Sequence, residues 1–321
     1  MNYSIILYIV GKVMMLESAC FLIPAVTSLI YGEHEGMAYL IVGAVSAIIG
    51  HLISSKKKFE NVFFAREGFV MVALSWIVLS VVGAIPFVLT GEIPNMVDAL
   101  FETVSGFTTT GASILEDVES LSHTSLIWRS FTHWVGGMGV IVLLLAILPM
   151  AGGYNMHLMK AESPGPVVGK LVPRLRDTAK ILYLIYLVMT VIEFVILVII
   201  KMPVFDALCI TFGTAGTGGF GIKADSIGSY AYAIQVVVTI FMILFGVNFN
   251  AYFVLLGKHK KEAFKIEEVR WYFGIIFAAI LIITVNIRGY FDNILIALNH
   301  AAFQVGSIIT TTGYSTTDFD R

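Results

Sequence analysis

Long apolar stretches alternate with short polar segments along the whole chain. A transmembrane helix needs about 20 consecutive, mostly apolar residues. Seven stretches meet this requirement, at residues 4–30, 37–54, 67–90, 126–148, 178–200, 230–256 and 270–287. The first stretch contains Lys12 and Glu17, so we expect it to pack against other helices rather than face lipid. The pattern predicts an all-α protein that crosses the membrane several times.

Basic residues fall in three of the connections between these stretches. Fourteen of the twenty Lys and Arg lie there, at Lys56, Lys57, Lys58, Arg66, Lys160, Lys170, Arg174, Arg176, Lys180, Lys258, Lys260, Lys261, Lys265 and Arg270. The connection from Gly91 to Ile127 has none. Because cytoplasmic loops carry the excess of positive charge, we expect the basic connections and the N-terminus to be cytoplasmic.

The three connections expected on the outer side share another pattern. Each begins with an apolar stretch too short to span the membrane and runs into a segment rich in Thr and Gly, at residues 94–113, 203–221 and 290–315. A short helix followed by irregular backbone between two spans is typical of a re-entrant pore loop.

These connections mark an internal repeat. Aligning the pairs Thr110-Gly111, Thr217-Gly218 and Thr312-Gly313 separates the glycines by 107 and 95 residues. The repeated unit is a helix, a pore loop and a second helix. We expect one unit at 67–150, a second at 175–257 and an incomplete third at 269–321, with two further helices at 1–55.

Such loops suit a cation that has lost its water. Rings of backbone carbonyl oxygens can replace the hydration shell, and glycine adopts the unusual dihedral angles that this requires. The C-terminal end of each short helix would direct partial negative charge at the cation, and Asp98 and Asp206 are candidate N-caps. One such motif is weak evidence, but three at the same place in a repeat favour an ion filter.

Composition agrees with a membrane protein, since 58% of the 321 residues are hydrophobic and only 13% are charged. The two cysteines, Cys20 and Cys209, lie in unrelated apolar segments and indicate neither a disulfide framework nor a metal site. No basic patch interleaved with aromatic residues is present, so we expect no nucleic-acid partner.

The chain resembles the Trk/Ktr/HKT potassium-transporter superfamily, and its bacterial TrkH-like branch most closely. The matching stretches are FETVSGFTTTGAS (101–113), WRSFTHWVGGMGVIVLLLAILP (128–149), AESPGP (161–166), LRDTAKILYLIYL (175–187), GTGGFG (216–221), FGVNFNAYF (245–253) and TTTGY (310–314). The resemblance implies four helix–pore loop–helix units around one pseudo-fourfold ion pore, with two extra N-terminal helices. The fourth unit is absent from the sequence given, so we expect this sequence to be a piece of a longer frame.

The resemblance also implies the site and the partners. Potassium (K⁺) would bind mainly to backbone carbonyls of Thr109, Thr110, Gly111, Gly216, Thr217, Gly218, Thr311, Thr312 and Gly313. It implies no organic cofactor. It implies a multi-pass protein of the bacterial inner membrane, surrounded by lipid, that forms a homodimer and binds a cytosolic, TrkA-like nucleotide-binding regulatory ring.

Two other classes of function fit the sequence less well. A secondary transporter of another cation or small solute is the main alternative, but its repeats are commonly inverted, whereas two-span units keep one orientation. An enzyme is not expected, because the seven histidines are scattered without ligand spacing.

Several single residues have two interpretations. Glu102 on the first pore helix could add negative field or bond to neighbouring helices, and Glu193 is an intramembrane acid of functional or structural use. Arg129 is expected to extend toward the membrane interface. His133 and Trp134 are interpreted as packing residues.

Overall fold

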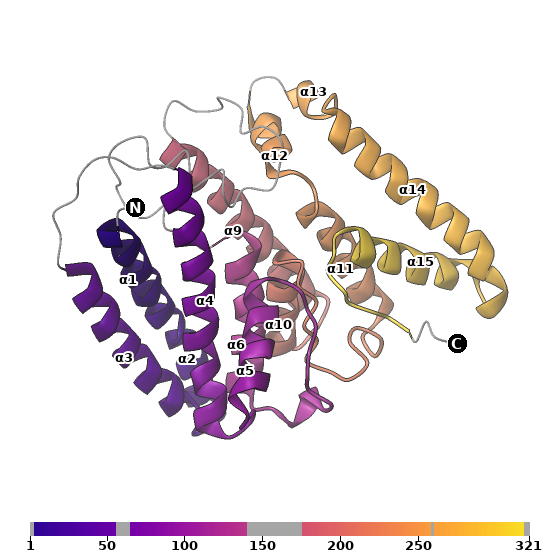
Figure 1. Cartoon of the computed structure of the whole chain (residues 1–321). Coiled ribbons are helices and arrows are strands. Elements are labelled where there is room, and N and C mark those ends of the chain that lie inside the picture. Colours follow the sequence, from indigo (N-terminus) through magenta and orange to yellow (C-terminus); the bar gives the residue numbers. More distant parts are fainter. Residues whose placement is uncertain (1–2, 56–64, 140–174, 258–259, 318–321) are drawn as a thin grey trace. The chain divides into compact units, whose positions relative to one another are not determined.

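The computed structural model describes residues 3–55, 65–139, 175–257 and 260–317, and every regular element among them is a helix. Figure 1 shows the helices coloured in chain order. The chain divides into two compact units. Unit 1 comprises residues 1–108 and 112–183, and unit 2 comprises 109–111 and 184–321. The all-α prediction is confirmed for the part of the chain that the structure describes.

Unit 1 contains the N-terminal helices and the first pore helix. Its elements are α1 (Tyr3–Cys20), α2 (Leu22–Tyr31), α3 (Gly36–Ser55), α4 (Ala65–Thr90), α5 (Met96–Phe107), the 3₁₀ turn η1 (Val118–Ser120) and α6 (His123–Gly137). Helix α9 (Leu175–Ile199) begins in unit 1 and continues into unit 2.

Helices α1 and α3 pack at their glycines. A Cβ atom on Gly11 would lie 2.6 Å from the carbonyl oxygen of Gly50, and a Cβ on Gly50 would lie 2.6 Å from that of Gly11. Small residues let transmembrane helices approach this closely. In the most apolar 18 residues of the span Tyr3–Tyr31, 50% are buried inside the protein. This confirms that the stretch packs against other helices.

The core of unit 1 is aromatic. Trp128 of α6 is fully buried, donates its indole N–H to the carbonyl of Gly83 at 3.1 Å, and lies 4.6 Å from Phe21 between ring centroids. Burial of large aromatic surfaces together with a satisfied indole N–H makes this packing strongly stabilising. His133 is also fully buried and Trp134 stacks on Phe131 at 5.5 Å, as expected of packing residues.

Unit 2 contains the second and third short helices. Its elements after α9 are α10 (Val204–Ala215), α11 (Tyr232–Phe245), α12 (Phe249–Leu256), α13 (Lys260–Ala263), α14 (Glu267–Ile287), the 3₁₀ turn η2 (Arg288–Tyr290) and α15 (Ile294–Ile309). Their shared core joins α9, α10, α11 and α15 through Leu197, Ile210, Val238 and Phe303.

Five helices in the described residues are long and apolar enough to cross a membrane: Tyr3–Tyr31, Gly36–Ser55, Arg66–Thr90, Ala179–Ile199 and Glu267–Tyr290. The predicted span 126–148 is represented by α6, and residues 140–148 lie outside the described part. The predicted span 230–256 is wrong as one continuous helix, because α11 and α12 are bent by 87°.

The bend has a chemical cause. Asn248 caps α12 by accepting the amide of Asn250 at 3.0 Å. The hydroxyl of Tyr252 donates to the carbonyl of Leu244 at 2.6 Å, and that of Tyr272 donates to the carbonyl of Ile243 at 2.9 Å. Side chains therefore satisfy carbonyls at the end of α11 where the helix stops.

The capping prediction for the pore helices is also wrong. Asn95 caps α5 by accepting the amide of Val97 at 3.0 Å, and Pro203 precedes α10 without a side-chain cap. Asp98 and Asp206 lie in the first turns instead, where a carboxylate still interacts favourably with the helix dipole.

Candidate ion-binding loops

The three short helices α5, α10 and α15 end in the same way. The residue that follows each helix and caps it donates its amide to the carbonyl four positions earlier. These residues are Thr108 (φ −82°, ψ 1°), Gly216 (φ −75°, ψ −7°) and Thr310 (φ −93°, ψ 0°). The three loops are thus aligned by their structure, independently of their sequences.

The next residue in every loop is a threonine in the left-handed region. The φ angles are 54° at Thr109, 51° at Thr217 and 60° at Thr311. Positive φ is a genuine outlier for a β-branched residue and costs about 1–2 kcal/mol. Strain repeated at three equivalent positions marks a backbone geometry that the surrounding structure imposes.

Two residues later each loop has a glycine with positive φ: Gly111 (75°), Gly219 (77°) and Gly313 (89°). Gly219, not Gly218, is therefore equivalent to Gly111 and Gly313, and the predicted register of the second loop is wrong by one residue. Gly216 is the helix cap, equivalent to Thr108 and Thr310. Aligning Thr109, Thr217 and Thr311 would have found this register, because all three begin the irregular backbone.

Amides in the second and third loops turn back to their helices. Gly218 donates to the carbonyl of Gly213 at 2.9 Å, and Thr217 to that of Thr214 at 3.0 Å. Thr312 and Thr311 make the same bonds to Ser307 at 2.8 Å and Ile308 at 3.1 Å. No peptide bond in these loops is cis, so each carbonyl is opposite its N–H group and points away from the helix. This applies to the carbonyls of Gly216, Thr217, Thr310 and Thr311.

The three loops lie against one another within unit 2. A Cβ atom on Gly111 would overlap the carbonyl oxygen of Gly218, and one on Gly219 would overlap that of Thr312. In both contacts the glycine of one loop touches the carbonyl just before the glycine of the next loop, which is Gly219 in the first case and Gly313 in the second. Around Gly313, nothing among the described residues lies within 4 Å of the same position.

A buried ion pair in unit 1 holds the segment that follows the first loop. Arg129, 3% exposed, places Nη2 and Nε each 2.7 Å from Oε1 of the fully buried Glu102. Glu102 also accepts the hydroxyl of Ser113 at 3.0 Å and the amide of Ile114 at 3.2 Å. The prediction that Arg129 extends to the interface is wrong, because Glu102 pairs with it in the interior. Sequence reasoning also missed Ser113, which bonds to Glu102 of α5 and to Arg129 of α6.

The third loop has polar supports of its own. His300 of α15 shares a hydrogen bond with Thr316 at 2.8 Å, and Ser307 donates its hydroxyl to the carbonyl of Tyr314 at 2.7 Å. Glu193 of α9 is fully buried beside Thr214 of α10. The contacts with α15 hold the third loop, and Glu193 of α9 packs against the second pore helix.

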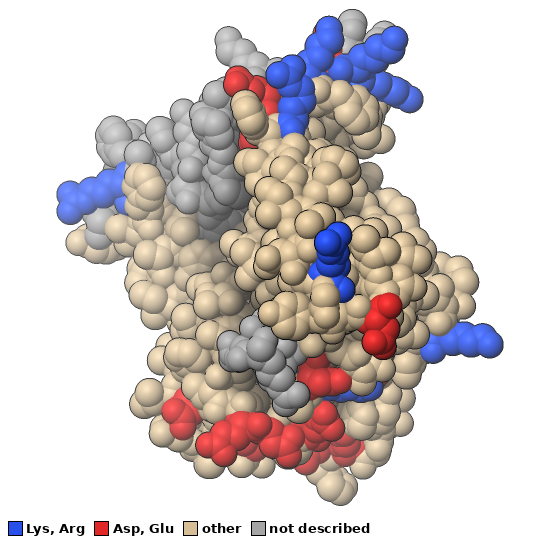
Figure 2. Space-filling view, turned by 90° about the vertical axis from the view of Figure 1, so that its right-hand side faces the viewer, with Lys and Arg blue, Asp and Glu red and all other residues tan. Residues whose placement is uncertain are grey.

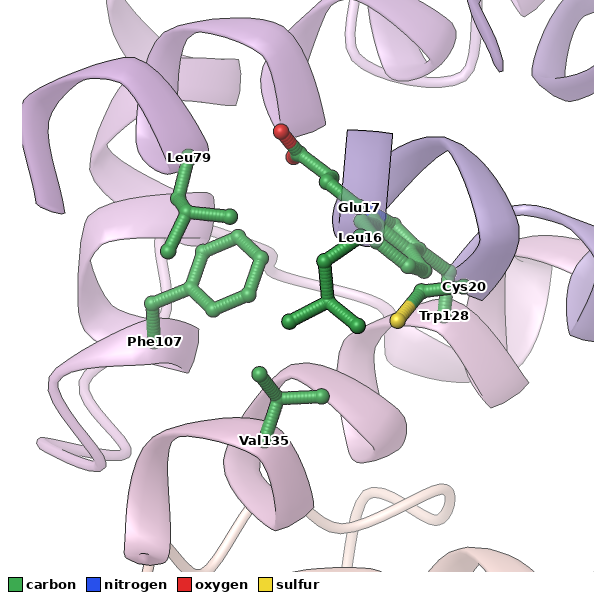
Figure 3. Close-up of a pocket in the computed structure, with 7 residues that line it drawn as sticks. All are labelled: Leu16, Glu17, Cys20, Leu79, Phe107, Trp128 and Val135. Atoms are coloured by element: carbon green, nitrogen blue, oxygen red, sulfur yellow. The ribbon is translucent and has the colours of Figure 1, made fainter. Parts of the chain in front are cut away.

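One pocket in unit 1 lies behind the end of α5 (Figure 3). Figure 3 shows Leu79, Phe107, Leu16 and Val135 around a shared space, with the carboxylate of Glu17 at its margin. Apolar side chains cannot replace the hydration shell of a cation, so this pocket is a poor ion site.

Acidic side chains are concentrated in the connection between the first loop and α6. Glu116, Asp117 and Glu119 are exposed between Gly111 and α6, and Figure 2 shows Asp and Glu side chains along one edge of the face in view. Acidic surfaces raise the local concentration of cations. In the described residues no group of three or more His, Cys, Asp or Glu could hold a metal ion, which leaves the loop carbonyls as the candidate ligands.

Glu33 organises the start of α6. It accepts the amides of His123 and Thr124, both at 2.9 Å, and the hydroxyl of Thr124 at 2.6 Å. Partial burial raises the pKa of Glu33, but the hydrogen bonds from Thr124 and His123 outweigh burial and leave the pKa below its ordinary value. Glu33 therefore carries its negative charge at neutral pH.

Comparison with known proteins identifies relatives along the whole chain. A family model described as "Cation transport protein" (TrkH) matches residues 35–321. The Trk system potassium uptake proteins TrkH of Salmonella typhimurium and Escherichia coli strain K12 are each 38% identical over 329 residues, covering 100% of this chain and 68% of the relative. An uncharacterized cation transporter of Methanocaldococcus jannaschii is 29% identical, covering 97% of this chain and 63% of that protein.

The fold also matches a solved structure. The crystal structure of the potassium transporter TrkH from Vibrio parahaemolyticus superimposes with a TM-score of 0.85 and 31% identity, covering 99% of this chain and 66% of that one. The chain thus spans about two thirds of the length of these relatives. The resemblance inferred from the sequence motifs is confirmed, and the chain belongs to the TrkH family of cation transport proteins.

Proposed function

We propose that this chain forms most of a potassium-translocating subunit of the bacterial inner membrane. The observation that carries the proposal is the common backbone of three pore loops, each with a strained threonine and a left-handed glycine, packed loop against loop. Irregular backbone survives at membrane depth only where it lines water or is buried in protein, and convergent carbonyls can bind a dehydrated cation. The relatives that carry potassium in their names support this choice of ion.

The proposed ligands are backbone carbonyls of equivalent loop positions. With the register of the second loop revised, they belong to Thr109, Thr110, Gly111, Thr217, Gly218, Gly219, Thr311, Thr312 and Gly313. The C-terminal ends of the three pore helices add partial negative charge behind these carbonyls. Arg129 does not oppose the cation strongly, because Glu102 neutralises it at 2.7 Å. Transport of K⁺ by this route requires no organic cofactor and no chemical reaction.

The membrane arrangement and the partners are part of the same proposal. The fourteen Lys and Arg of the three basic connections favour a cytoplasmic location for these connections and for the N-terminus. We expect a homodimer whose cytoplasmic face binds a nucleotide-binding regulatory ring. The names of the relatives, which assign them to a Trk system, support a multicomponent assembly.

Uptake of radioactive rubidium into liposomes tests the function. The complete polypeptide specified by the coding frame is reconstituted, and K⁺ and Na⁺ compete with rubidium. We expect K⁺ to compete strongly and Na⁺ weakly. In Gly111→Ser the new Cβ displaces the carbonyl of Gly218, so the preference for K⁺ should fall at least about tenfold, which corresponds to about 1.4 kcal/mol.

Gly91→Ser is the matched control. Gly91 also has a positive φ, 79°, but nothing lies within 4 Å of its Cβ position. It therefore reports the backbone strain of a serine without a contact to the loops, and it should keep the K⁺ preference. If no cation enters, or if Gly111→Ser competes like the unmodified protein, the loops are not a potassium filter and transport of another solute becomes the better hypothesis.

A further inference from the structure

Tyr314 follows the glycine of the third loop and reaches the second loop. Its side chain is fully buried in the core of unit 2, beside Ile210 and Phe303. The hydroxyl lies 3.3 Å from the carbonyl oxygen of Ile210 on α10 and 3.4 Å from that of Phe220, which follows Gly219. One hydroxyl group thus joins the third loop to both the second pore helix and the second loop.

The second pore helix leaves room for this hydroxyl. A Cβ atom on Gly213 would overlap the Tyr314 hydroxyl and would lie 3.1 Å from the ring carbon Cζ that bears it. Gly213 lies inside α10, where φ is negative, so its backbone does not require glycine. A glycine costs about 0.5–1 kcal/mol in a helix, and here the close approach of the tyrosine hydroxyl accounts for it.

The second and third loops therefore touch at two places. The carbonyl of Thr312 contacts Gly219, and the hydroxyl of Tyr314 lies at the carbonyl of Phe220. Gly219 and Phe220 are consecutive in the second loop, and Thr312 and Tyr314 flank Gly313 in the third. Because a tyrosine ring is rigid, the distance between the backbones of the two loops is set by the length of its side chain.

We infer that Tyr314 is a positioning residue that fixes the spacing between the second and third loops and thereby sets the preference for K⁺ over Na⁺. This inference rests on the proposed function. The equivalent residues of the other loops are Ala112 and Phe220, so Tyr314 is the position of the three that carries a hydroxyl. Its carbonyl is held in turn by Ser307 at 2.7 Å.

Tyr314→Phe removes the hydroxyl and keeps the ring. Measured by competition against rubidium uptake of the complete polypeptide in liposomes, it should lower the K⁺ preference about two- to tenfold, the range expected for one hydrogen bond, with little change in maximal uptake rate. When Tyr314 is present, Gly213→Ala should lower the K⁺ preference by more than Tyr314→Phe does, because the new Cβ displaces the tyrosine hydroxyl. In the Tyr314→Phe background the same substitution should cost clearly less, because the atom it overlaps is gone.

Tyr230→Phe is the matched control. Tyr230 belongs to the same core and its hydroxyl donates to Asp206 at 2.8 Å, near the start of α10 and not at a loop carbonyl. It should keep the K⁺ preference. If Gly213→Ala alone yields no folded protein, recovery of folded yield by Tyr314→Phe tests the same contact.

Three results would overturn the inference: an unchanged preference in Tyr314→Phe, an equal loss in Tyr230→Phe, or the same cost of Gly213→Ala in both backgrounds. Failure of the proposed function itself is distinct, because the unmodified protein would then show no preference for K⁺ before any substitution is made.

Discussion

At the scale of single residues, strain and burial in this protein accumulate at the pore loops. Threonine is a poor choice for a left-handed position, which glycine usually occupies at a helix C-terminus. Here Thr109, Thr217 and Thr311 all occupy it. A stiff residue held in an unfavourable conformation keeps its carbonyl in one direction, whereas glycine would allow several.

Thr217→Gly tests this trade-off. The substitution relieves about 1–2 kcal/mol of strain and costs about 0.5–1 kcal/mol in chain entropy, so thermal unfolding in detergent should show unchanged or slightly higher stability. The K⁺ preference should nevertheless fall, because the carbonyl is no longer fixed. Lys201→Gly is the control, since Lys201 has φ 66° outside the loops and should leave the preference intact. Full K⁺ preference in Thr217→Gly would show that the strained threonine is dispensable.

The ion pair behind the first loop gives a prediction about stability. Glu102→Ala leaves Arg129 buried without its carboxylate, and removing one partner of a buried pair costs about 3–5 kcal/mol. We expect a large drop in the thermal midpoint in detergent. Glu116→Ala, at an exposed acid in the same unit, should change the free energy of unfolding by less than about 0.5 kcal/mol. Equal midpoints for the two variants would contradict the buried pair.

At the scale of elements, hydropathy predicted helices well and their interruptions poorly. Apolar stretches of about 20 residues predicted the membrane spans, and shorter apolar stretches predicted the three short helices. The stretch 230–256 is equally apolar, yet it bends at Gly246, where Asn248 and two tyrosine hydroxyls satisfy the freed backbone. Likewise the adjacent Gly218 and Gly219 offered two registers, and the backbone dihedral angles and amide hydrogen bonds select Gly219 as the equivalent of Gly111 and Gly313. Hydropathy carries neither kind of information, because both features depend on hydrogen bonds of individual backbone groups.

Helix capping yields a pH-dependent prediction. The pKa of Glu33 is lowered in the folded protein by the hydrogen bonds that Thr124 and His123 donate at the start of α6. The stabilisation is therefore fully present above the unfolded pKa of about 4.3 and is lost as pH falls through the lower folded value. We expect Glu33→Gln to be less stable than the unmodified protein by about 1 kcal/mol at pH 7, a typical cap contribution. Thermal midpoints measured from pH 7 to pH 3 should converge at the acid end, and a constant difference would refute the role of the charge.

At the scale of the whole molecule, the lysines and arginines are concentrated in alternate connections between the spans. The basic connections and the connections that hold the pore loops alternate along the chain, as expected when successive spans cross in opposite directions. The two spans of each predicted unit would place all three loops on one side. A filter built from several loops requires this arrangement, since each loop supplies only a few carbonyls.

Labelling of single cysteines in intact cells tests that topology. In a background with Cys20→Ser and Cys209→Ala, Ser120→Cys lies in the exposed connection after the first loop and Lys261→Cys lies in an exposed basic connection. A maleimide that cannot cross the membrane should label the first variant in intact cells and the second only after permeabilisation. This expectation follows from the positive-inside rule, which predicts that the lysines and arginines near Lys261 stay in the cytoplasm. The opposite labelling pattern would place the N-terminus outside. That pattern would also mean that the pore loops face the cytoplasm. A filter that takes up K⁺ must open toward the medium, so the proposed direction of transport would then be wrong.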